Sequence, residues 1–206
     1  MTVRKSPPLR IALLVETPAW TRRLPAVAAL VRKFARAAVT AALADGAAAP
    51  KGARPWALTV LLADDAELKA LNHDFRGKAK PTNVLSFPAW EGAPLSRGAR
   101  GQEPVNLGDI AIALTVTAAE SRKQGKRLAD HLAHLTVHGV LHLFGYDHLD
   151  DSQADDMEGL ERAVLARHGI ADPYLLRPAR KAVSRARKTP VAKPGGRART
   201  AARTRT

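Results

Sequence analysis

A group of three histidines constrains this chain more than any other feature of its sequence. Residues 138–148 read HGVLHLFGYDH, with imidazoles at relative positions i, i+4 and i+10. On a helix the first two histidines lie about 40° apart around the axis and one turn apart along it, so both face the same side. Gly145 predicts a left-handed residue that ends the helix, and the turn after it returns His148 toward that side. The spacing therefore predicts a metal site on His138, His142 and His148.

The ligand types indicate which metal this site would hold. Zinc accepts three imidazoles, whereas structural zinc sites usually close with four protein ligands that often include cysteine. This chain has no cysteine. Three neutral imidazoles leave the ion its full charge and an open position, where a bound water is acidified to a pKa of about 7. We therefore expect one zinc ion per chain, hydrolytic chemistry and an anionic substrate such as a phosphodiester.

The same spacing occurs in the extended zinc-protease pattern H-E-x-x-H-x-x-G-x-x-H, but Gly139 stands at the position of the catalytic glutamate. A protease is therefore a minor alternative, because the general base of peptide hydrolysis is missing. Glycine inside a helix costs ~1 kcal/mol relative to alanine, so we expect another segment to approach Gly139 closely. Asp147 is the nearest carboxylate that could act as a base, although a hydrogen-bonding or turn role is favoured. His134 is expected to lie in the core or behind the ligands.

Length and charge predict one folded domain and a basic tail. With 206 residues, 46% of them hydrophobic, the chain is long enough for one core. Eleven of its 33 lysines and arginines lie in residues 177–206, which contain no acid, while the other 22 face 19 acids in residues 1–176. We expect a domain over 1–176 and a disordered tail over 177–206 that binds nucleic acid or acts only as a solubilising extension. The missing cysteines and apolar runs indicate no disulfide partner, no membrane association and a cytoplasmic location.

Hydrophobic periodicity predicts an α+β domain. Strands are expected at residues 9–16, 56–63, 83–87 and 106–114; helices are expected at 24–43, from Asp64 or Asp65 to Phe75, at 117–124, around the histidines, and at 151–167. A long loop is expected over residues 89–105. These elements predict a single domain in which a small mixed sheet packs against helices, among them a central metal-binding helix.

Several segments resemble one protein family. Residues 71–78 read LNHDFRGK, residues 81–88 read PTNVLSFP, and together with the 138–148 run, the LGDI of residues 107–110 and the acidic helix near Met157 they resemble the YbeY family of bacterial rRNA maturation factors. The resemblance covers roughly residues 56 to 168. One departure is Ala79, where many relatives have an acid after the lysine.

The resemblance implies a zincin-like α+β fold, zinc on the three histidines, and a single-strand-specific endoribonuclease. It further implies 3′-end maturation of small-subunit rRNA, ribosome quality control, and the small ribosomal subunit with its assembly factors as partners. The family's functional arginine corresponds to Arg76, and Arg76 and His138 are the candidate catalytic residues. An arginine fork can bind two phosphate oxygens, but the alternative for Arg76 is a surface salt bridge. A non-catalytic assembly factor with a structural zinc is the alternative function.

Overall fold

The computed structural model describes residues 8–50, 54–90 and 103–175. The elements follow one another as β1 (Leu9–Val15), α1 (Ala19–Arg23), α2 (Val27–Asp45), β2 (Trp56–Ala63), α3 (Asp65–Arg76), β3 (Val84–Pro88), β4 (Val105–Ala113), α4 (Leu114–Lys123), α5 (Leu128–Leu143) and α6 (Asp151–Ala166). In the described ranges no helix is both long and apolar enough to cross a membrane. The tail assigned to residues 177–206 lies outside the described residues.

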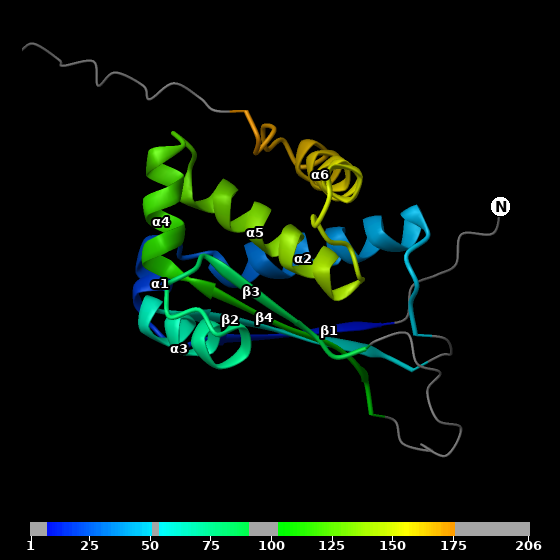
Figure 1. Ribbon diagram of the computed structural model, residues 1–206, viewed down its shortest axis with the longest axis horizontal. Helices are drawn as coiled ribbons and strands as arrows, with labels where there is room; N and C mark the ends of the chain where they lie inside the picture. Colours follow the sequence, from blue (N-terminus) through cyan, green and yellow to red (C-terminus); the bar gives the residue numbers. More distant parts are fainter. Residues whose placement is uncertain (1–7, 51–53, 91–102, 176–206) are drawn as a thin grey trace, which may run out of the picture.

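The four strands form one mixed sheet in the order β1-β2-β4-β3. β1, β2 and β4 run parallel, while β3 is antiparallel to β4 and forms one edge. Figure 1 shows α2 and α5 on one face of this sheet with α6 stacked outside them, and α3 on the opposite face. The expected small mixed sheet packed against helices is confirmed, and the histidine helix is its central helix.

The two faces of the sheet carry cores of different size. The larger core joins α2, α5 and α6 to the sheet through side chains such as Phe34, Leu62 and Leu141. The smaller core lies under α3 and consists of Leu68, Leu85 and three alanines. Asp64 caps the N-terminus of α3: its Oδ1 accepts hydrogen bonds from the backbone N–H groups of Ala66 and Glu67 at 2.9 and 3.0 Å.

Three element predictions differ from the structure. The α2 helix begins at Val27, three residues after the expected start, because Leu24 is the residue that ends α1. The short α1 was not predicted, because five residues carry no readable periodicity; the helix is fixed by tertiary contact, since the buried Trp20 donates its indole N–H to the Ala63 carbonyl at 3.1 Å. The α4 helix begins at Leu114, three residues before the expected start. The carboxylate of Asp65, about fifty residues earlier in the sequence, accepts a hydrogen bond from the backbone N–H of Thr115 at 3.0 Å and so caps this helix. Such a distant partner cannot be predicted from the local sequence.

The α5 helix lies unusually close to the sheet at Gly139. A Cβ placed there would lie 2.8 Å from Cγ2 of Ile110 on β4 and 3.2 Å from Oγ of Ser86 on β3. Side-chain contacts this short do not occur in well-packed proteins, so only glycine fits. The expected close approach is confirmed, and it sets the depth at which His138 and His142 sit above the sheet.

Gly139→Ala should therefore lower the free energy of unfolding by about 1–3 kcal/mol, because overpacking outweighs the helix propensity of alanine. Gly159, in α6, has nothing within 4 Å of an added Cβ and offers the matched control. Gly159→Ala should leave stability unchanged or raise it by up to about 1 kcal/mol. Urea unfolding of both variants checks this pair; two variants of equal stability would contradict the close approach.

Candidate metal centre and active site

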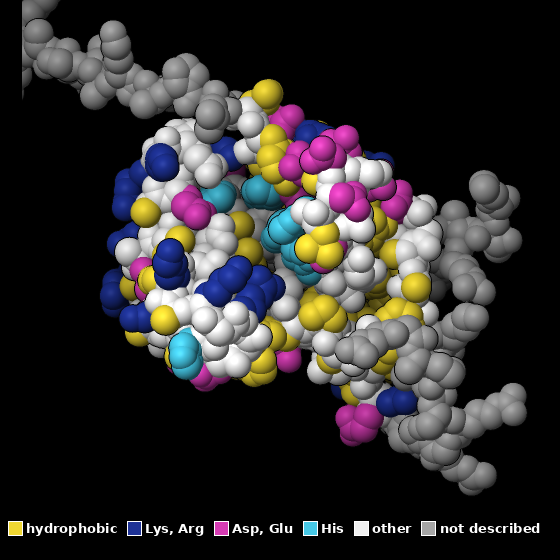
Figure 2. All heavy atoms as spheres, viewed as in Figure 1, with side chains coloured by type: hydrophobic (Ala, Val, Ile, Leu, Met, Phe, Trp, Pro, Cys, Tyr) yellow, Lys and Arg dark blue, Asp and Glu magenta, His cyan; other side chains and the backbone are white. Residues whose placement is uncertain are grey.

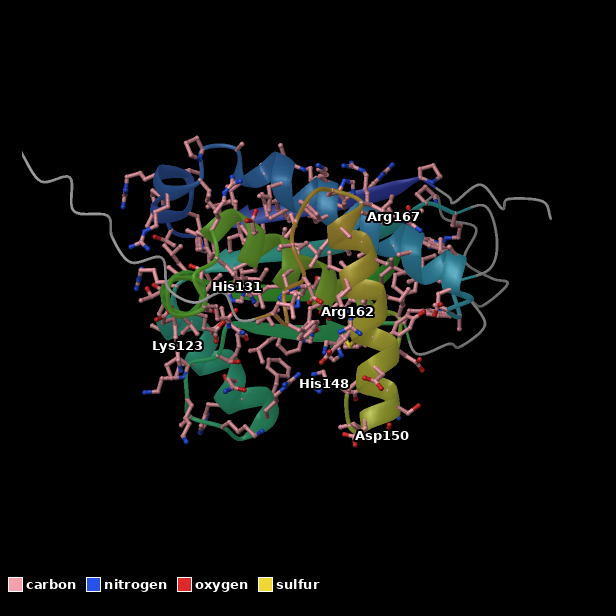
Figure 3. All side chains as sticks on the ribbon, turned by 90° about the horizontal axis from the view of Figure 1, so that it is seen from above. Lys123, His131, His148, Asp150, Arg162 and Arg167 are labelled. Atoms are coloured by element: carbon pink, nitrogen blue, oxygen red, sulfur yellow. The ribbon has the colours of Figure 1, made fainter. Side chains whose placement is uncertain are left out.

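The three predicted histidines come together at the C-terminal end of α5. Gly145, with φ +85°, ends the helix, and the following turn brings His148 back to His138 and His142. One ring nitrogen from each histidine lies within 4.8 Å of the others, and the Nε2 atoms of His138 and His142 are 3.1 Å apart. Two tetrahedral ligands at 2.0–2.1 Å from one ion lie roughly 3.4 Å apart, so this spacing suits a bound metal. His148 lies beside α6 in Figure 3.

Hydrogen bonds determine which nitrogen of each helix histidine is free. Nδ1 of His138 lies 2.8 Å from Oε1 of Glu161, and Nδ1 of His142 lies 2.9 Å from the Tyr146 carbonyl oxygen. Both oxygens are acceptors, so each Nδ1 carries the proton in the neutral ring. The two Nε2 atoms then face each other with unprotonated lone pairs. A cation between them removes that repulsion, which is why the donor set fits a metal.

The imidazole of His142 is ready to bind a metal without losing a proton. Burial, followed by the neighbouring His138 and His148, lowers the pKa of His142 to about 4. At neutral pH the ring is therefore uncharged. A metal ligand must be unprotonated, so this depressed pKa favours binding.

Glu161 is the central residue behind the metal site, and the sequence analysis missed it. Its side chain is fully buried and accepts hydrogen bonds from His138, from Nε2 of His134 at 2.7 Å and from the Tyr174 hydroxyl. Burial alone would raise the pKa of Glu161, but the hydrogen bonds from His134 and His138 outweigh it and lower that pKa to about 2. The carboxylate is thus charged, and it orients His138 with Nε2 toward the site.

A sequence signal for Glu161 did exist. Glu161 lies on the same helical stripe as Met157, Val164 and Leu165, all of which are buried. Glu161 is four residues after Met157, three before Val164 and four before Leu165. Residues at these spacings lie on the same side of a helix, so the pattern predicts that Glu161 faces the core. A buried carboxylate requires a partner, and the histidines of α5 are the available donors.

A cavity of about 400 Å³ extends from the metal site toward α4. His138 and His148 lie at one end, and Asn83, Glu120 and Lys126 at the other. Oε2 of Glu120 accepts from the Asn83 side-chain amide and lies 2.9 Å from Nε2 of the buried His131, whose pKa is lowered mainly by burial. Figure 2 shows the histidines lining a hollow on this face, with lysines and arginines beside it. The candidate metal site therefore has an open side, lined by both polar and apolar residues, that is large enough for part of a substrate.

The other candidate residues lie in three different positions. His134 is bound to Glu161 and stands behind the triad, as expected. Asp147 accepts the backbone N–H of His148 at 2.8 Å, which fits the turn role rather than that of a base. Arg76 is exposed at the end of α3 and does not line the cavity. The structure thus brings the three histidines together and leaves Arg76 outside their immediate surroundings.

An open cluster of three imidazoles, two on a central helix of an α+β domain and one on the turn that follows it, is typical of metal-dependent hydrolases. The family model of "Endoribonuclease YbeY" matches residues 26–169 of this chain. The chain therefore belongs to the YbeY endoribonuclease family, whose members are hydrolases that act on RNA.

Named relatives agree with this assignment over most of their length. The chain is 47% identical to Endoribonuclease YbeY of Paramagnetospirillum magneticum over 169 residues, which cover 81% of this chain and 96% of that protein. It is 48% identical to the Rhodospirillum rubrum protein of the same name, with 81% and 82% covered, and 52% identical to that of Alkalilimnicola ehrlichii, with 77% and 87% covered. A solution structure from Thermotoga maritima has a TM-score of 0.43 at 20% identity and covers 80% of this chain and 99% of that one.

Glu161→Gln should weaken metal binding by about 10–100-fold, because the neutral amide no longer fixes the tautomer of His138 or compensates the charge of the ion. Competition with a chromophoric chelator measures the affinity. Asp155→Asn, an exposed acid on the same helix, is the control and should bind metal like the wild type. Equal affinity in all three proteins would remove Glu161 from the site.

The same variant should change how the stability of the metal-free protein depends on pH. The folded-state pKa of Glu161, about 2, lies below its ordinary value of 4.5. The stabilisation from its ionised form is therefore complete above about pH 4.5 and is lost as the pH falls toward 2. The difference in unfolding free energy between wild type and Glu161→Gln should shrink over that interval. A constant difference from pH 7 to pH 2.5 would contradict the assignment.

Proposed function

We propose that this protein is a zinc-dependent, single-strand-specific endoribonuclease that matures the 3′ end of small-subunit rRNA and takes part in ribosome quality control. Its partners would be single-stranded rRNA, the small ribosomal subunit and its assembly factors, and such a role would place it in the cytoplasm. The observation that carries the proposal is the open side of the histidine triad, which faces a cavity lined by both polar and apolar side chains. A structural zinc in a non-catalytic assembly factor would be better served by a closed site.

Zinc is the metal that this donor set suits, because three neutral nitrogen ligands and no thiolate leave an open position. When bound, the ion would supply Lewis-acid stabilisation of a phosphodiester and a more acidic water. His138, His142 and His148 would hold it. Glu161 keeps His138 oriented, and the Tyr146 carbonyl does the same for His142.

The remaining catalytic work falls to this chain's cations. Arg76 would bind the phosphate backbone of the RNA near the cavity and stabilise the negative charge that builds up on the phosphate oxygens. Gly139 lies against Ile110, so α5 has no room for the carboxylate that a zinc protease uses at that position. Peptide hydrolysis therefore remains the weaker alternative.

The metal assignment is tested by elemental analysis and RNA cleavage together. Untagged protein should contain about one zinc per chain and cut single-stranded RNA, while His142→Ala, purified in parallel, should lose both properties. The parallel purification controls for contaminating nuclease. Equal zinc in both proteins would refute the site, and equal cleavage would return the protein to the assembly-factor alternative.

Arg76→Ala should reduce cleavage by about 100-fold or more while zinc content and unfolding free energy stay close to wild type. An exposed arginine contributes little to the free energy of unfolding, but a group that binds the phosphate lowers the free energy of the transition state of cleavage. Arg36→Ala, an exposed arginine on α2, is the matched control. Wild-type cleavage by the Arg76 variant would leave Arg76 as an ordinary surface residue.

We propose further that the folded domain ends near residue 176 and that residues 177–206 are an RNA-binding arm. Each phosphate neutralised on a single strand contributes about −0.7 to the slope of log affinity against log salt, so half of the eleven bases would contribute roughly −3 to −4. Truncation after Leu176 should flatten that slope and leave zinc content and melting temperature unchanged. An unchanged slope would refute the arm, and an earlier melt would refute the boundary.

A further inference from the structure

Phe75 is an exposed aromatic residue beside the cation assigned to catalysis. Its side chain, at the end of α3, is 67% exposed, although most phenylalanines are buried. The ring is held in place, since it packs edge-on against Phe87 of β3 with centroids 4.9 Å apart. One face of an ordered ring therefore remains available to solvent.

Three cations follow this ring in the sequence on an ordered segment. Arg76, Lys78 and Lys80 are exposed, and none forms a salt bridge with any residue that the structure describes. The buried Asn72 fixes the segment: its side-chain amide donates to the Lys80 carbonyl at 2.7 Å, and its own carbonyl accepts from Lys78 N at 3.2 Å. These cations are therefore presented from a fixed backbone.

The segment leads directly to the metal cavity. Its continuation reaches Asn83, which lines the cavity together with His138 and His148. On β3, Ser86 faces α5 at Gly139, while the next residue, Phe87, faces α3 and Phe75. The outer edge of β3 is unpaired in the described sheet. A chain that leaves the cavity across this edge would therefore pass toward the Phe75–Phe87 pair. Figure 2 shows basic side chains next to the histidines.

We propose that the Phe75–Phe87 pair is a stacking platform for one unpaired nucleobase of the RNA, while Arg76, Lys78 and Lys80 hold the flanking phosphates. An exposed aromatic ring among unpaired cations is the arrangement by which proteins bind single-stranded nucleic acid. Bases in a duplex already stack on their neighbours, so this platform gives the single-strand preference a physical origin. The proposal rests on the proposed function, which it extends to a specific binding site.

The test is binding of zinc-loaded, full-length protein to a short fluorescent single-stranded RNA, measured at several salt concentrations. Phe75→Ala should weaken binding by about 5- to 100-fold, whereas Phe75→Tyr should bind within a few-fold of wild type. The salt slope should stay the same in Phe75→Ala and become shallower in Lys78→Ala, because only the latter loses a phosphate contact. Leu14→Ala, which truncates another exposed apolar side chain (54% exposed) on β1, is the matched control and should have no effect.

Two further arms separate stacking from packing. Phe75→Leu keeps apolar contact with Phe87 and should melt close to wild type, yet it should bind RNA almost as weakly as Phe75→Ala. RNA with abasic sites should bind wild type and Phe75→Ala equally. The proposal would be overturned if Phe75→Ala or Phe75→Leu bound RNA with wild-type affinity. It would also be overturned if Phe75→Ala still preferred intact RNA over abasic RNA as strongly as the wild type does.

Binding is read separately from cleavage, so the two proposals can fail independently. A wild type that binds RNA through Phe75 but never cuts it would leave the platform standing and refute the nuclease. A wild type that cuts RNA while the Phe75 variants bind it normally would do the reverse.

Discussion

The buried carboxylate of Glu161 is the interaction on which the rest of this site depends. It joins α6 to two histidines of α5 and to Tyr174 in the segment that follows α6. An isolated buried carboxylate would be costly, but three donors converge on this one, and those from His134 and His138 keep it ionised. With a metal in place, its negative charge also offsets part of the positive charge of the ion. The same carboxylate therefore holds α6 against α5 and orients His138.

The sheet determines where that arrangement is built. Gly139 lets α5 approach β3 and β4 closely, with Ile110 occupying the space that a side chain would need. Gly139 stands where a zinc protease has its catalytic glutamate. Because it has no side chain, it also lets the histidines of α5 come close to the edge strand β3. Asn83 and Val84, at the start of β3, line the cavity. Thus α5 and the turn after it supply the candidate ligands, and the edge strand borders the space beside them.

The sequence was sufficient for features that depend on local spacing. The clustering of the three histidines, the four strands and the close approach at Gly139 follow from periodicity and from glycine placement, and the structure agrees with them. Features that depend on tertiary partners were not predictable in this way. The α1 helix is held by Trp20 against β2. The position of Glu161 on the buried stripe of α6 can be read from the sequence, but its partners His134, His138 and Tyr174 depend on how α6 packs. Residues 177–206 lie outside the described chain, so the tail remains a prediction.

The histidines of α5 show why residue type alone does not identify a metal ligand. His131 and His134 each bind a carboxylate through Nε2, to Glu120 and Glu161 respectively. Glu161 instead binds His138 through Nδ1, and the Tyr146 carbonyl binds His142 through the same atom, so that both Nε2 atoms remain free. One carboxylate therefore makes His134 a supporting residue and His138 a candidate ligand, and the difference lies in which ring nitrogen it engages.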